Sequence, residues 1–561
     1  MTAAPAEVLI AGAGPAGLVL ALTLAHNGIP VRIIDKLATP HVGQKGAGIQ
    51  PRSLEVYKFL DVLPDILWEG RYSPPMRVYK LPGGTEPLKT WYLAEHSEPK
   101  PPTPYLNGIM LGQDHLESIL RDHLARRGCH VEMATELLDF EQDSEKVVAR
   151  IQKKADGNDL VETVNVKFLV GTDGAKGIVR KQLGLKFLGE TRDDTHILIG
   201  DIQIHGLDND HWHMWKNEKD EQVLLRPTER FDNVFTLMCG GDIDHAKMAS
   251  DPKALIQWIK SVIQRDDLKF GGSFTWLSDF RPNIRMVDTF GKGRVFVAGD
   301  AAHVHSPTGG QGMNSSIQDC FNLGWKLALV CKGLSPLKLL TTYTEERLPV
   351  IQEMLQVTTK LLNKTVGQGV DQSAWKRGGA LNQLGVNYRW SSIVLDERTS
   401  VKEVAQTVQA AYGQVVAGDG VEVIRAGDRA PDAPGLISRF PKSSSEHPTS
   451  LFQIFKPTFH TALIFTRHPE KAAAIAQFLQ QALPPNSVYA VAIAPGTSGY
   501  GPHVHFEAVD SAFIDVHGYA YKHYGVESEE MTVVLVRPDG VVGAVVSSTD
   551  GLERYFQNIF V

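Results

Sequence analysis

The sequence has few cysteines and no excess of positive charge. Its 561 residues include four cysteines, and none of them forms a CxxC pair. This argues against a disulfide framework and against a cysteine zinc site, so we expect no metal and a reducing, cytoplasmic location. The formal net charge is −7, without the excess of Lys and Arg that is typical of nucleic-acid-binding proteins, so we expect no nucleic acid as a partner.

Long apolar runs are scarce too. Only Val8 to Ala25 suggests a signal peptide or a membrane span, but no positive residue precedes it, and glycines and a proline interrupt it near its start. We therefore expect a short strand and a buried helix here, and no association with a membrane. A chain of this length exceeds one compact core, so it predicts several domains.

A glycine-rich turn follows the first expected strand. Residues 7–11 predict a buried strand, residues 18–26 a helix, and residues 31–34 a second strand that ends at Asp35. Gly12 permits a tight turn, Gly14 lets the backbone approach a pyrophosphate, and Gly17 allows the helix to pack closely on the strand. Asp35 is placed to bind a ribose hydroxyl. This context predicts a nucleotide cofactor without distinguishing NAD from FAD.

A second glycine-rich segment, VFVAGDAAHVHSPTGGQGMNSS, spans residues 295–316. An apolar run ends near Gly299 and Asp300, and two histidines, His303 and His305, precede a proline, three more glycines and the start of a helix. Three interpretations of this segment are open: a metal site, a phosphate-binding loop, or a binding site for a larger cofactor. Histidines at i and i+2 without acidic or cysteine partners are weak metal ligands, so we favour the cofactor.

The middle and the end of the chain have different characters. Residues 184–285 contain alternating runs that predict an inserted antiparallel sheet over a ligand. On one expected strand, His211, His213 and Trp215 would share a face, which is either an ordinary polar and aromatic sheet face or the wall of a pocket for an aromatic substrate. From about Gly427 onward the pattern predicts an α/β domain without a catalytic signature.

Three segments together resemble the class A flavoprotein aromatic hydroxylases, the phenol hydroxylase and para-hydroxybenzoate hydroxylase family. They are residues 12–17, residues 171–174 (GTDG) and residues 294–314. The resemblance implies an α/β, Rossmann-like FAD-binding fold with an inserted antiparallel sheet for the substrate and a thioredoxin-like C-terminal domain without CxxC. The implied boundaries are 1–183 with 286–412 for the FAD domain, 184–285, with or without 72–105, for the substrate domain, and 427–561 for the last domain.

The same resemblance implies FAD as cofactor, NADPH or NADH as transient co-substrate, O2, and a homodimer. Residues 310–314 would present helix N-terminal amides to the N1 edge of the flavin, which is anionic when reduced. The implied cofactor contacts are Gly12, Ala13, Gly14, Pro15, Ala16, Gly17, Asp35, Lys36, Gln44, Gln113, Asp173, Asp300, Gly310, Gln311, Gly312, Met313 and Asn314.

The implied reaction is hydroxylation of a small phenolic substrate through a flavin C4a-hydroperoxide. The chain departs from the family pattern, because Ala47 stands where phenol hydroxylase has an aspartate, Gly177 replaces a serine, and the expected Arg and Tyr are absent from the strand at 233–238. We therefore expect other groups to activate the phenol. The candidate catalytic residues are His213, as base, and Pro307; the candidate substrate contacts are His213, Trp215, Arg226 and Thr236.

Other functions stay open at this point. Oxidative decarboxylation of a para-hydroxybenzoate-type acid would release CO2, and epoxidation or Baeyer–Villiger oxidation of a secondary metabolite uses the same cofactor. A non-catalytic flavin sensor would consume no NAD(P)H in response to any phenol. A metal enzyme that uses His303 and His305 would lose its activity to a chelator.

Overall fold

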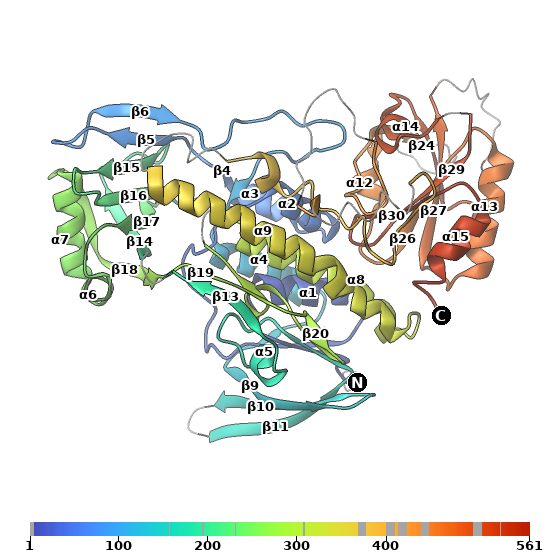
Figure 1. Ribbon diagram of the computed structural model, residues 1–561, viewed down its shortest axis with the longest axis horizontal. Coiled ribbons are helices and arrows are strands. Elements are labelled where there is room, and N and C mark those ends of the chain that lie inside the picture. The colour runs from blue at the N-terminus through green and yellow to red at the C-terminus, as the bar shows by residue number, and fades with distance from the viewer. Residues whose placement is uncertain are drawn as a thin grey trace.

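We describe the protein from a computed structural model. The structure describes residues 5–155, 158–192, 196–230, 232–306, 309–368, 377–399, 410–412, 423–438, 448–496, 506, 508–527 and 529–561. Figure 1 shows three units in a row, with the central unit between a sheet capped by α6 and α7 and the C-terminal unit. Pro307 lies outside the described residues.

The central unit contains a six-stranded sheet in which all neighbours but one are parallel. Its order is β20 (Gly291–Lys292), β21 (Val295–Val297), β12 (Phe168–Gly171), β1 (Val8–Ala11), β2 (Val31–Ile34) and β8 (Val131–Glu132). The strands β1 and β12 are wholly buried, which suits a parallel sheet covered on both faces. The carboxyl ends of β1, β2, β12 and β21 therefore meet at one edge, where such sheets bind ligands.

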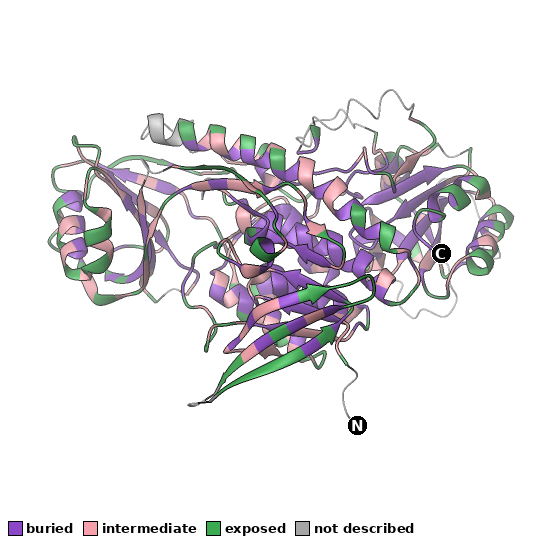
Figure 2. Ribbon diagram, turned by 60° about the horizontal axis from the view of Figure 1, so that its bottom comes forward, coloured by how far each residue is buried: buried purple, intermediate pink, exposed green. Residues whose placement is uncertain are grey.

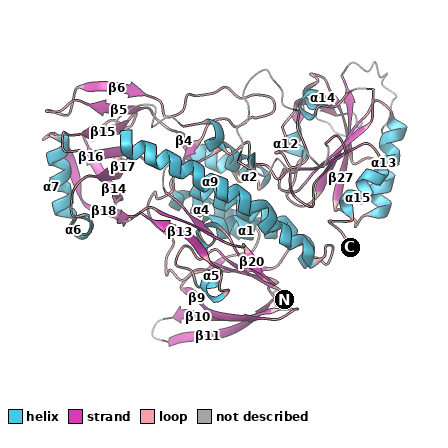
Figure 3. Cartoon of the chain, viewed as in Figure 1, coloured by secondary structure: helices cyan, strands magenta, loops and turns pink. Residues whose placement is uncertain are grey.

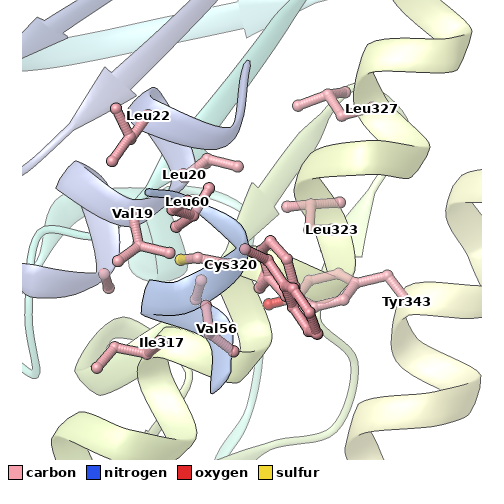
Figure 4. Close-up of a cluster of buried hydrophobic side chains, with 14 of the residues drawn as sticks. Val19, Leu20, Leu22, Val56, Leu60, Ile317, Cys320, Leu323, Leu327 and Tyr343 are labelled. Atoms are coloured by element: carbon pink, nitrogen blue, oxygen red, sulfur yellow. The ribbon is translucent and has the colours of Figure 1, made fainter. Parts of the chain in front are cut away.

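Two apolar helices pack beside this sheet. Helix α1 (Pro15–His26) begins directly after the glycine-rich turn and packs against α8 (Gly312–Cys331) and α4 (Gln113–Ala125). Figure 4 shows the contact, in which Val19 and Leu20 from α1 face Ile317, Cys320 and Leu323 from α8. This core fixes the two glycine-rich segments relative to each other, because each segment leads straight into one of the two helices.

Shorter elements complete the central unit (Figure 3). They include three small three-stranded sheets. The first contains β9 (Thr135–Gln142), β10 (Val147–Ala155) and β11 (Asn158–Val166), and the second contains β13 (Phe187–Thr191), β19 (Asn283–Val287) and β22 (His303–Val304). The third contains β3 (Gly48–Ile49), β7 (Ile109–Met110) and β4 (Arg71–Tyr72). The further helices are α2 (Pro51–Phe59), α3 (Leu63–Glu69), α5 (Ile178–Gln182) and the long α9 (Thr341–Gln368).

The second unit is built on a seven-stranded sheet. Its order is β18 (Lys269–Phe280), β14 (Ile197–His205), β17 (Val234–Gly240), β16 (Gln222–Pro227), β15 (Trp212–Lys216), β5 (Met76–Tyr79) and β6 (Pro87–Trp91). All neighbours are antiparallel except β15 and β5. The helices α6 (His245–Ser250) and α7 (Pro252–Ile263) lie at this sheet, and apolar residues of α7 pack into the core of one of its faces.

The C-terminal unit is an eight-stranded mixed sheet whose strands are largely buried (Figure 2). Its order is β23 (Leu395–Asp396), β30 (Val542–Val546), β29 (Thr532–Val536), β26 (His460–Phe465), β27 (Val488–Pro495), β28 (Ser511–Asp515), β24 (Pro434–Ser438) and β25 (Thr449–Ser450). The helices are α12 (Leu451–Ile454), α13 (Pro469–Ala482), α14 (Tyr519–Tyr524) and α15 (Thr549–Phe556). The architecture confirms the predicted fold class; the thioredoxin-like character of this unit stays a prediction.

A buried ion network joins the C-terminal unit to the central one. Glu346 on α9 bridges Arg537, at 2.7 Å, and Lys326 on α8, also at 2.7 Å. Asp539 pairs with Arg537 and accepts a hydrogen bond from Trp325. Arg537, Glu346 and Lys326 are fully enclosed by protein, so their charges compensate one another.

Candidate active site

One cavity of about 2640 Å³ extends from the carboxyl edge of the parallel sheet to the seven-stranded sheet. Gly12 and Asp35 line its first part, and Arg226 and Thr236 line its far part. Single-ligand pockets typically measure roughly 300–1,000 Å³. The cavity therefore has room for a large cofactor and a second ligand side by side.

The turn after β1 is a cradle built from backbone. Gly12 has a φ of +108°, and a Cβ added to it would lie 2.3 Å from the carbonyl oxygen of Thr172. A Cβ on Gly17 would lie 2.0 Å from the carbonyl oxygen of Gly12, whereas a Cβ on Gly14 would meet nothing within 4 Å. The first and third glycines are thus required by packing, and the second keeps space free at the N-terminus of α1, where a phosphate is stabilised by the helix amides.

Asp35 holds this turn in place. Its Oδ2 accepts a hydrogen bond from the amide of Ala13 at 2.9 Å, and its Oδ1 accepts one from the amide of Leu37, also at 2.9 Å. Asp35 lines the cavity together with Lys36, Pro15 and Ala16. The carboxylate therefore stands at the end of β2 beside the cradle, as a ribose-binding acid must.

The start of α8 forms the second wall. Gly310 has a φ of +62°, in the left-handed region, and Gly310, Gln311, Gly312 and Met313 all line the cavity. The side chain of Gln311 is turned to the protein, because its Nε2 donates to the carbonyl oxygens of Gly309 and Leu381. The wall at this point is therefore mostly backbone.

Asn314 supports this wall from behind. Its Oδ1 accepts from the amide of Gln50, and its Nδ2 donates to the carbonyl oxygens of Gly48 and Gly310, each at 2.8 Å. The side chain is fully buried. It ties β3 to the beginning of α8 and so holds the loop, while the predicted contact of the Asn314 backbone amide with the cofactor stays a prediction.

Three further predicted residues reach the cavity. Asp300, Asp173 and Gln113 line it at different points. The surrounding protein raises the pKa of the Asp300 carboxyl, although the side chain is open to the cavity. Burial also raises the pKa of Asp173, against a hydrogen bond from the amide of Val179, and its Oδ1 has no partner among the described residues. Asp173 therefore lies beside the first cradle with this oxygen buried against the protein.

The two histidines of the 295–316 segment have separate partners. His303 is buried, and its Nε2 lies 2.6 Å from Oδ2 of Asp319, whose Oδ1 accepts from Nε of Arg347 at 2.7 Å. His305 lies against Gly312, where an added Cβ would be 2.8 Å from Nε2 of the imidazole. Burial lowers the pKa of His305 to about 4, so this ring is neutral at physiological pH.

These features fit FAD. The cradle after β1 leaves room for a pyrophosphate, Asp35 stands where a ribose lies, and the amides at the start of α8 suit an electron-rich ring edge. The predicted FAD contacts that line the cavity come from the ends of four strands, β1, β2, β12 and β21, and from the starts of α4 and α8.

A row of polar and aromatic side chains crosses the seven-stranded sheet on its cavity side. The register pairs Arg226 on β16 with Thr236 on β17, Thr236 with Asp201 on β14, and Asp201 with Trp276 on β18. Trp212 on β15 extends the row, because its ring centre lies 5.7 Å from Cζ of Arg226. Of this row, Trp212, Arg226, Thr236 and Trp276 line the cavity.

Hydrogen bonds connect the members of the row. Nη2 of Arg226 donates to Oγ1 of Thr236 at 3.0 Å, and Oγ1 of Thr236 donates to Oδ1 of Asp201 at 2.9 Å. Nε1 of Trp276 donates to Oδ2 of Asp201 at 2.5 Å. Nη1 of Arg226 and Nε1 of Trp212 have no hydrogen-bond partner within the described part of the chain.

The structure contradicts the predicted roles of His213 and Trp215 at the substrate. Both side chains are 0 % exposed and do not line the cavity. Nδ1 of His213 lies 2.7 Å from the hydroxyl of Tyr79, and its ring stacks on Trp215, in the core beneath α7. Because neighbouring residues of a strand point to opposite faces, the cavity receives Trp212 instead. Burial lowers the pKa of His213 to about 4.

Gln44 is also placed differently from the prediction. It is 2 % exposed and does not line the cavity. Its Nε2 donates to Glu229 at 2.8 Å, its Oε1 accepts from Nη2 of Arg226 at 2.9 Å, and its amide donates to Oδ2 of Asp201 at 2.7 Å. Gln44 therefore links the central unit to the polar row and has no free group for a cofactor.

The sequence prediction missed Asp201, Trp212 and Trp276. The sequence predicted that His211, His213 and Trp215 share one face of a strand, but this alternation does not determine which face of the sheet meets the ligand. Asp201 stands in an apolar strand, ILIGDIQIH, and a lone carboxylate in such a strand is a signal that could have identified it.

Comparison with known proteins decides the family. A family model described as "FAD binding domain" matches residues 5–358, and one described as "Phenol hydroxylase, C-terminal dimerisation domain" matches residues 473–561. A flavin-dependent monooxygenase of Mycobacteroides abscessus is 33% identical over 98% of this chain and 99% of its own. The chain belongs to the flavin-dependent monooxygenases. It is accordingly an enzyme that binds FAD and uses O2 and a reduced nicotinamide.

Two other monooxygenases show the range of the family. Pentachlorophenol 4-monooxygenase of Sphingobium chlorophenolicum is 30% identical over 65% of this chain and 66% of its own. The solved structure of aklavinone-11 hydroxylase with FAD and aklavinone superposes with a TM-score of 0.77 at 22% identity, covering 100% of both chains. The similarity to aklavinone-11 hydroxylase concerns the fold alone.

Within the described residues, no helix combines the length and the apolar character needed to cross a bilayer.

Proposed function

We propose that this monooxygenase hydroxylates a phenolic aromatic compound at the expense of NADPH or NADH and O2. One observation supports this most directly: a single cavity joins the FAD cradle to the polar and aromatic row of the seven-stranded sheet. The named relatives include an enzyme that acts on pentachlorophenol. A phenol bound against the row would lie in the same space as the reacting end of the cofactor.

The wall of the far part suits an aromatic ring with an oxygen substituent. Trp212 and Trp276 offer flat surfaces, and Ile199, Met238 and Phe280 add apolar contact. Arg226 and Thr236 offer a cation and a hydroxyl for the phenolic oxygen. Buried donors that would be left unpaired by an analogue without that oxygen give selectivity for the phenol.

The chain itself positions, shields and ionises the substrate. Bound FAD supplies the redox chemistry that activates O2. Arg226 and Thr236 are themselves buried, so little water screens their interactions with a bound ligand. Arg226 favours the phenolate over the phenol, and a phenolate ring is a better nucleophile for an incoming oxygen atom.

We also propose an organisation for the whole chain. Residues 1–183 and 286–412 form most of the FAD-binding domain, residues 184–285 with strands from 72–105 most of the substrate domain, and residues 427–561 a thioredoxin-like domain. The exceptions are β13 and β19, which pair in the central unit, and β23, which joins the C-terminal sheet. The match of residues 473–561 to a dimerisation domain supports a homodimer through this last part.

The test is a survey of phenols and hydroxybenzoates with the FAD-loaded enzyme. We expect several phenols to stimulate NADPH or NADH oxidation and to yield products that carry one more hydroxyl group. Release of CO2 from a hydroxybenzoate would instead indicate oxidative decarboxylation. A yellow protein whose NAD(P)H oxidation responds to no aromatic compound would contradict the proposal and favour a flavin sensor.

A further inference from the structure

The polar row contains a hydroxyl with one acceptor position to spare. Oγ1 of Thr236 donates to Oδ1 of Asp201 at 2.9 Å and accepts from Nη2 of Arg226 at 3.0 Å. A hydroxyl oxygen has one proton and two lone pairs, so a second lone pair remains. Thr236 lines the cavity, and this remaining position suits an O–H donor from a bound ligand.

Asp201 is held so that only one of its oxygens is available. Its Oδ2 already accepts from the amide of Gln44 at 2.7 Å and from Nε1 of Trp276 at 2.5 Å. Its Oδ1 accepts from Thr236. The carboxylate cannot turn without breaking the first two bonds, so any proton it receives on Oδ1 comes through Thr236.

We infer that a phenol bound in this cavity is ionised by a two-step relay through Thr236 to Asp201. This inference rests on the proposed hydroxylation of a phenol. The phenolic O–H bond breaks as Oγ1 of Thr236 gains that proton, and the original Thr236 O–H bond breaks as Oδ1 of Asp201 gains the second proton. No electron leaves or enters, and the phenolate remains beside Arg226.

The charges around the relay favour this transfer. Burial raises the pKa of Asp201 more than its three hydrogen bonds lower it, which makes this carboxylate a better proton acceptor than an exposed one. Arg226 on β16 compensates the carboxylate before the transfer and the phenolate after it. The net charge of the buried site is therefore the same in both states, so no buried charge is created.

The other charged groups near the relay have their own partners. Glu229 pairs with His115 at 2.9 Å and accepts from Gln44. Burial raises the pKa of Glu229, but hydrogen bonds from His115, its own amide and Gln44 outweigh this and lower it to about 2. Glu229 thus stays ionised and does not take the proton. Arg71 donates to the carbonyl oxygens of Thr228 and Asn209 and adds positive potential near Arg226.

The relay also explains a departure in the sequence. Ala47, a residue without an acid–base group, occupies the place of the aspartate of phenol hydroxylase and lines the same cavity. The carboxylate that replaces it comes from β14, on the substrate sheet, and reaches the ligand through a hydroxyl on the neighbouring strand.

The experiment compares Thr236→Val, which keeps the shape but removes the hydroxyl, with Thr236→Ser, which restores it. Thr163→Val on the exposed strand β11 is the matched control. Phenols that are neutral at the assay pH are compared with nitrophenols that are already ionised. General base catalysis typically contributes 10²–10⁴-fold, so we expect Thr236→Val to slow neutral phenols by about 100-fold and ionised ones little.

A second measurement needs no turnover. The ultraviolet difference spectrum of 4-nitrophenol titrated against pH in the presence of each FAD-loaded variant reports the pKa of the bound phenol. We expect Thr236→Val and Asp201→Asn to raise that pKa relative to the wild type and Thr236→Ser to leave it close. Asp201→Asn also disturbs the Gln44 contact, so its melting temperature is recorded, whereas Thr236→Val leaves that contact intact.

The outcomes separate the relay from the proposed function. Equal losses for neutral and ionised phenols, with an unchanged pKa of bound nitrophenol, would overturn the relay and leave Thr236 a packing residue. Full activity of Thr236→Val on neutral phenols would overturn it as well. If Thr236→Val raises the pKa of bound nitrophenol and Thr236→Ser does not, but the wild type oxidises no NAD(P)H with any phenol, the proposed hydroxylation fails while the relay stands.

Discussion

The amide of Ala13 donates to Oδ2 of Asp35 at 2.9 Å, which joins the turn after β1 to the end of β2. The same carboxylate is the predicted contact for a ribose of FAD, so one residue both holds the turn and binds the cofactor. We therefore expect FAD affinity to respond to small substitutions in the turn that do not change the stability of the protein.

Gly14→Ala tests the cradle. An added Cβ meets nothing within 4 Å in the protein, and the φ of Gly14 is −71°, so we expect an unchanged melting temperature of the apoprotein. The methyl group enters the space of the pyrophosphate, so the dissociation constant for FAD should rise at least about tenfold, a loss of roughly 1.4 kcal/mol. Fluorescence titration with FAD measures it.

Gly272→Ala is the control for that experiment, because its Cβ also meets nothing within 4 Å and it lies on β18 away from the cradle. Equal FAD affinity for both variants and the wild type would place the pyrophosphate elsewhere.

Arg226→Lys tests the substrate wall. Lysine keeps the charge but loses the planar fork that contacts Thr236 and Gln44. Hydrogen bonds to charged groups contribute roughly 1.5–3 kcal/mol, so we expect KM for a phenol to rise about 10-fold or more. Steady-state kinetics provide the measurement.

His213→Gln is the matched change on the other face of the sheet. We expect it to lower the free energy of unfolding by roughly 1–3 kcal/mol, because it leaves the hydroxyl of Tyr79 without its buried partner. KM and the pH profile should not change. A lost catalytic pKa in this variant would reinstate His213 as the base.

Glu346→Gln tests the junction between the central and C-terminal units. It removes the shared counter-ion of Arg537 and Lys326, both 0 % exposed. Breaking a buried pair typically costs about 3–5 kcal/mol, so we expect a markedly lower melting temperature. Exposed Glu553→Gln on α15 is the control, and equal melting of the two variants would mean that the network contributes little.

The pair of His115 and Glu229 gives a pH dependence. The hydrogen bond to Glu229 raises the pKa of His115, so its stabilisation is present below the unfolded pKa of about 6.5 and is lost as pH rises through the folded value. We expect His115→Gln to lower the melting temperature more at about pH 5.5 than at about pH 8. A difference that grows with pH would contradict the pairing.

The cofactor half of the site was predictable from the sequence because its chemistry is local. Gly12, Gly14 and Gly17 act through backbone conformation within one strand–turn–helix unit, and Asp35 follows the next strand directly. Such features can be recognised in the sequence without knowledge of the rest of the fold.

The substrate half was not predictable to the same degree. Arg226, Thr236 and Asp201 become neighbours only through the register of three strands, and a one-residue shift reverses which face meets the cavity. The family resemblance implied a cofactor contact for Gln44, but its partners, Glu229 and Asp201, are more than a hundred residues away in the sequence.

The most direct test of the account is the fate of isotopically labelled O2 in the reaction of the FAD-loaded enzyme with NADPH or NADH and a phenol that stimulates oxidation. We predict one labelled oxygen atom in the new ring hydroxyl and one nicotinamide oxidised for each product formed. An unlabelled product, or nicotinamide oxidation that yields only hydrogen peroxide with every phenol tested, would contradict the central claim.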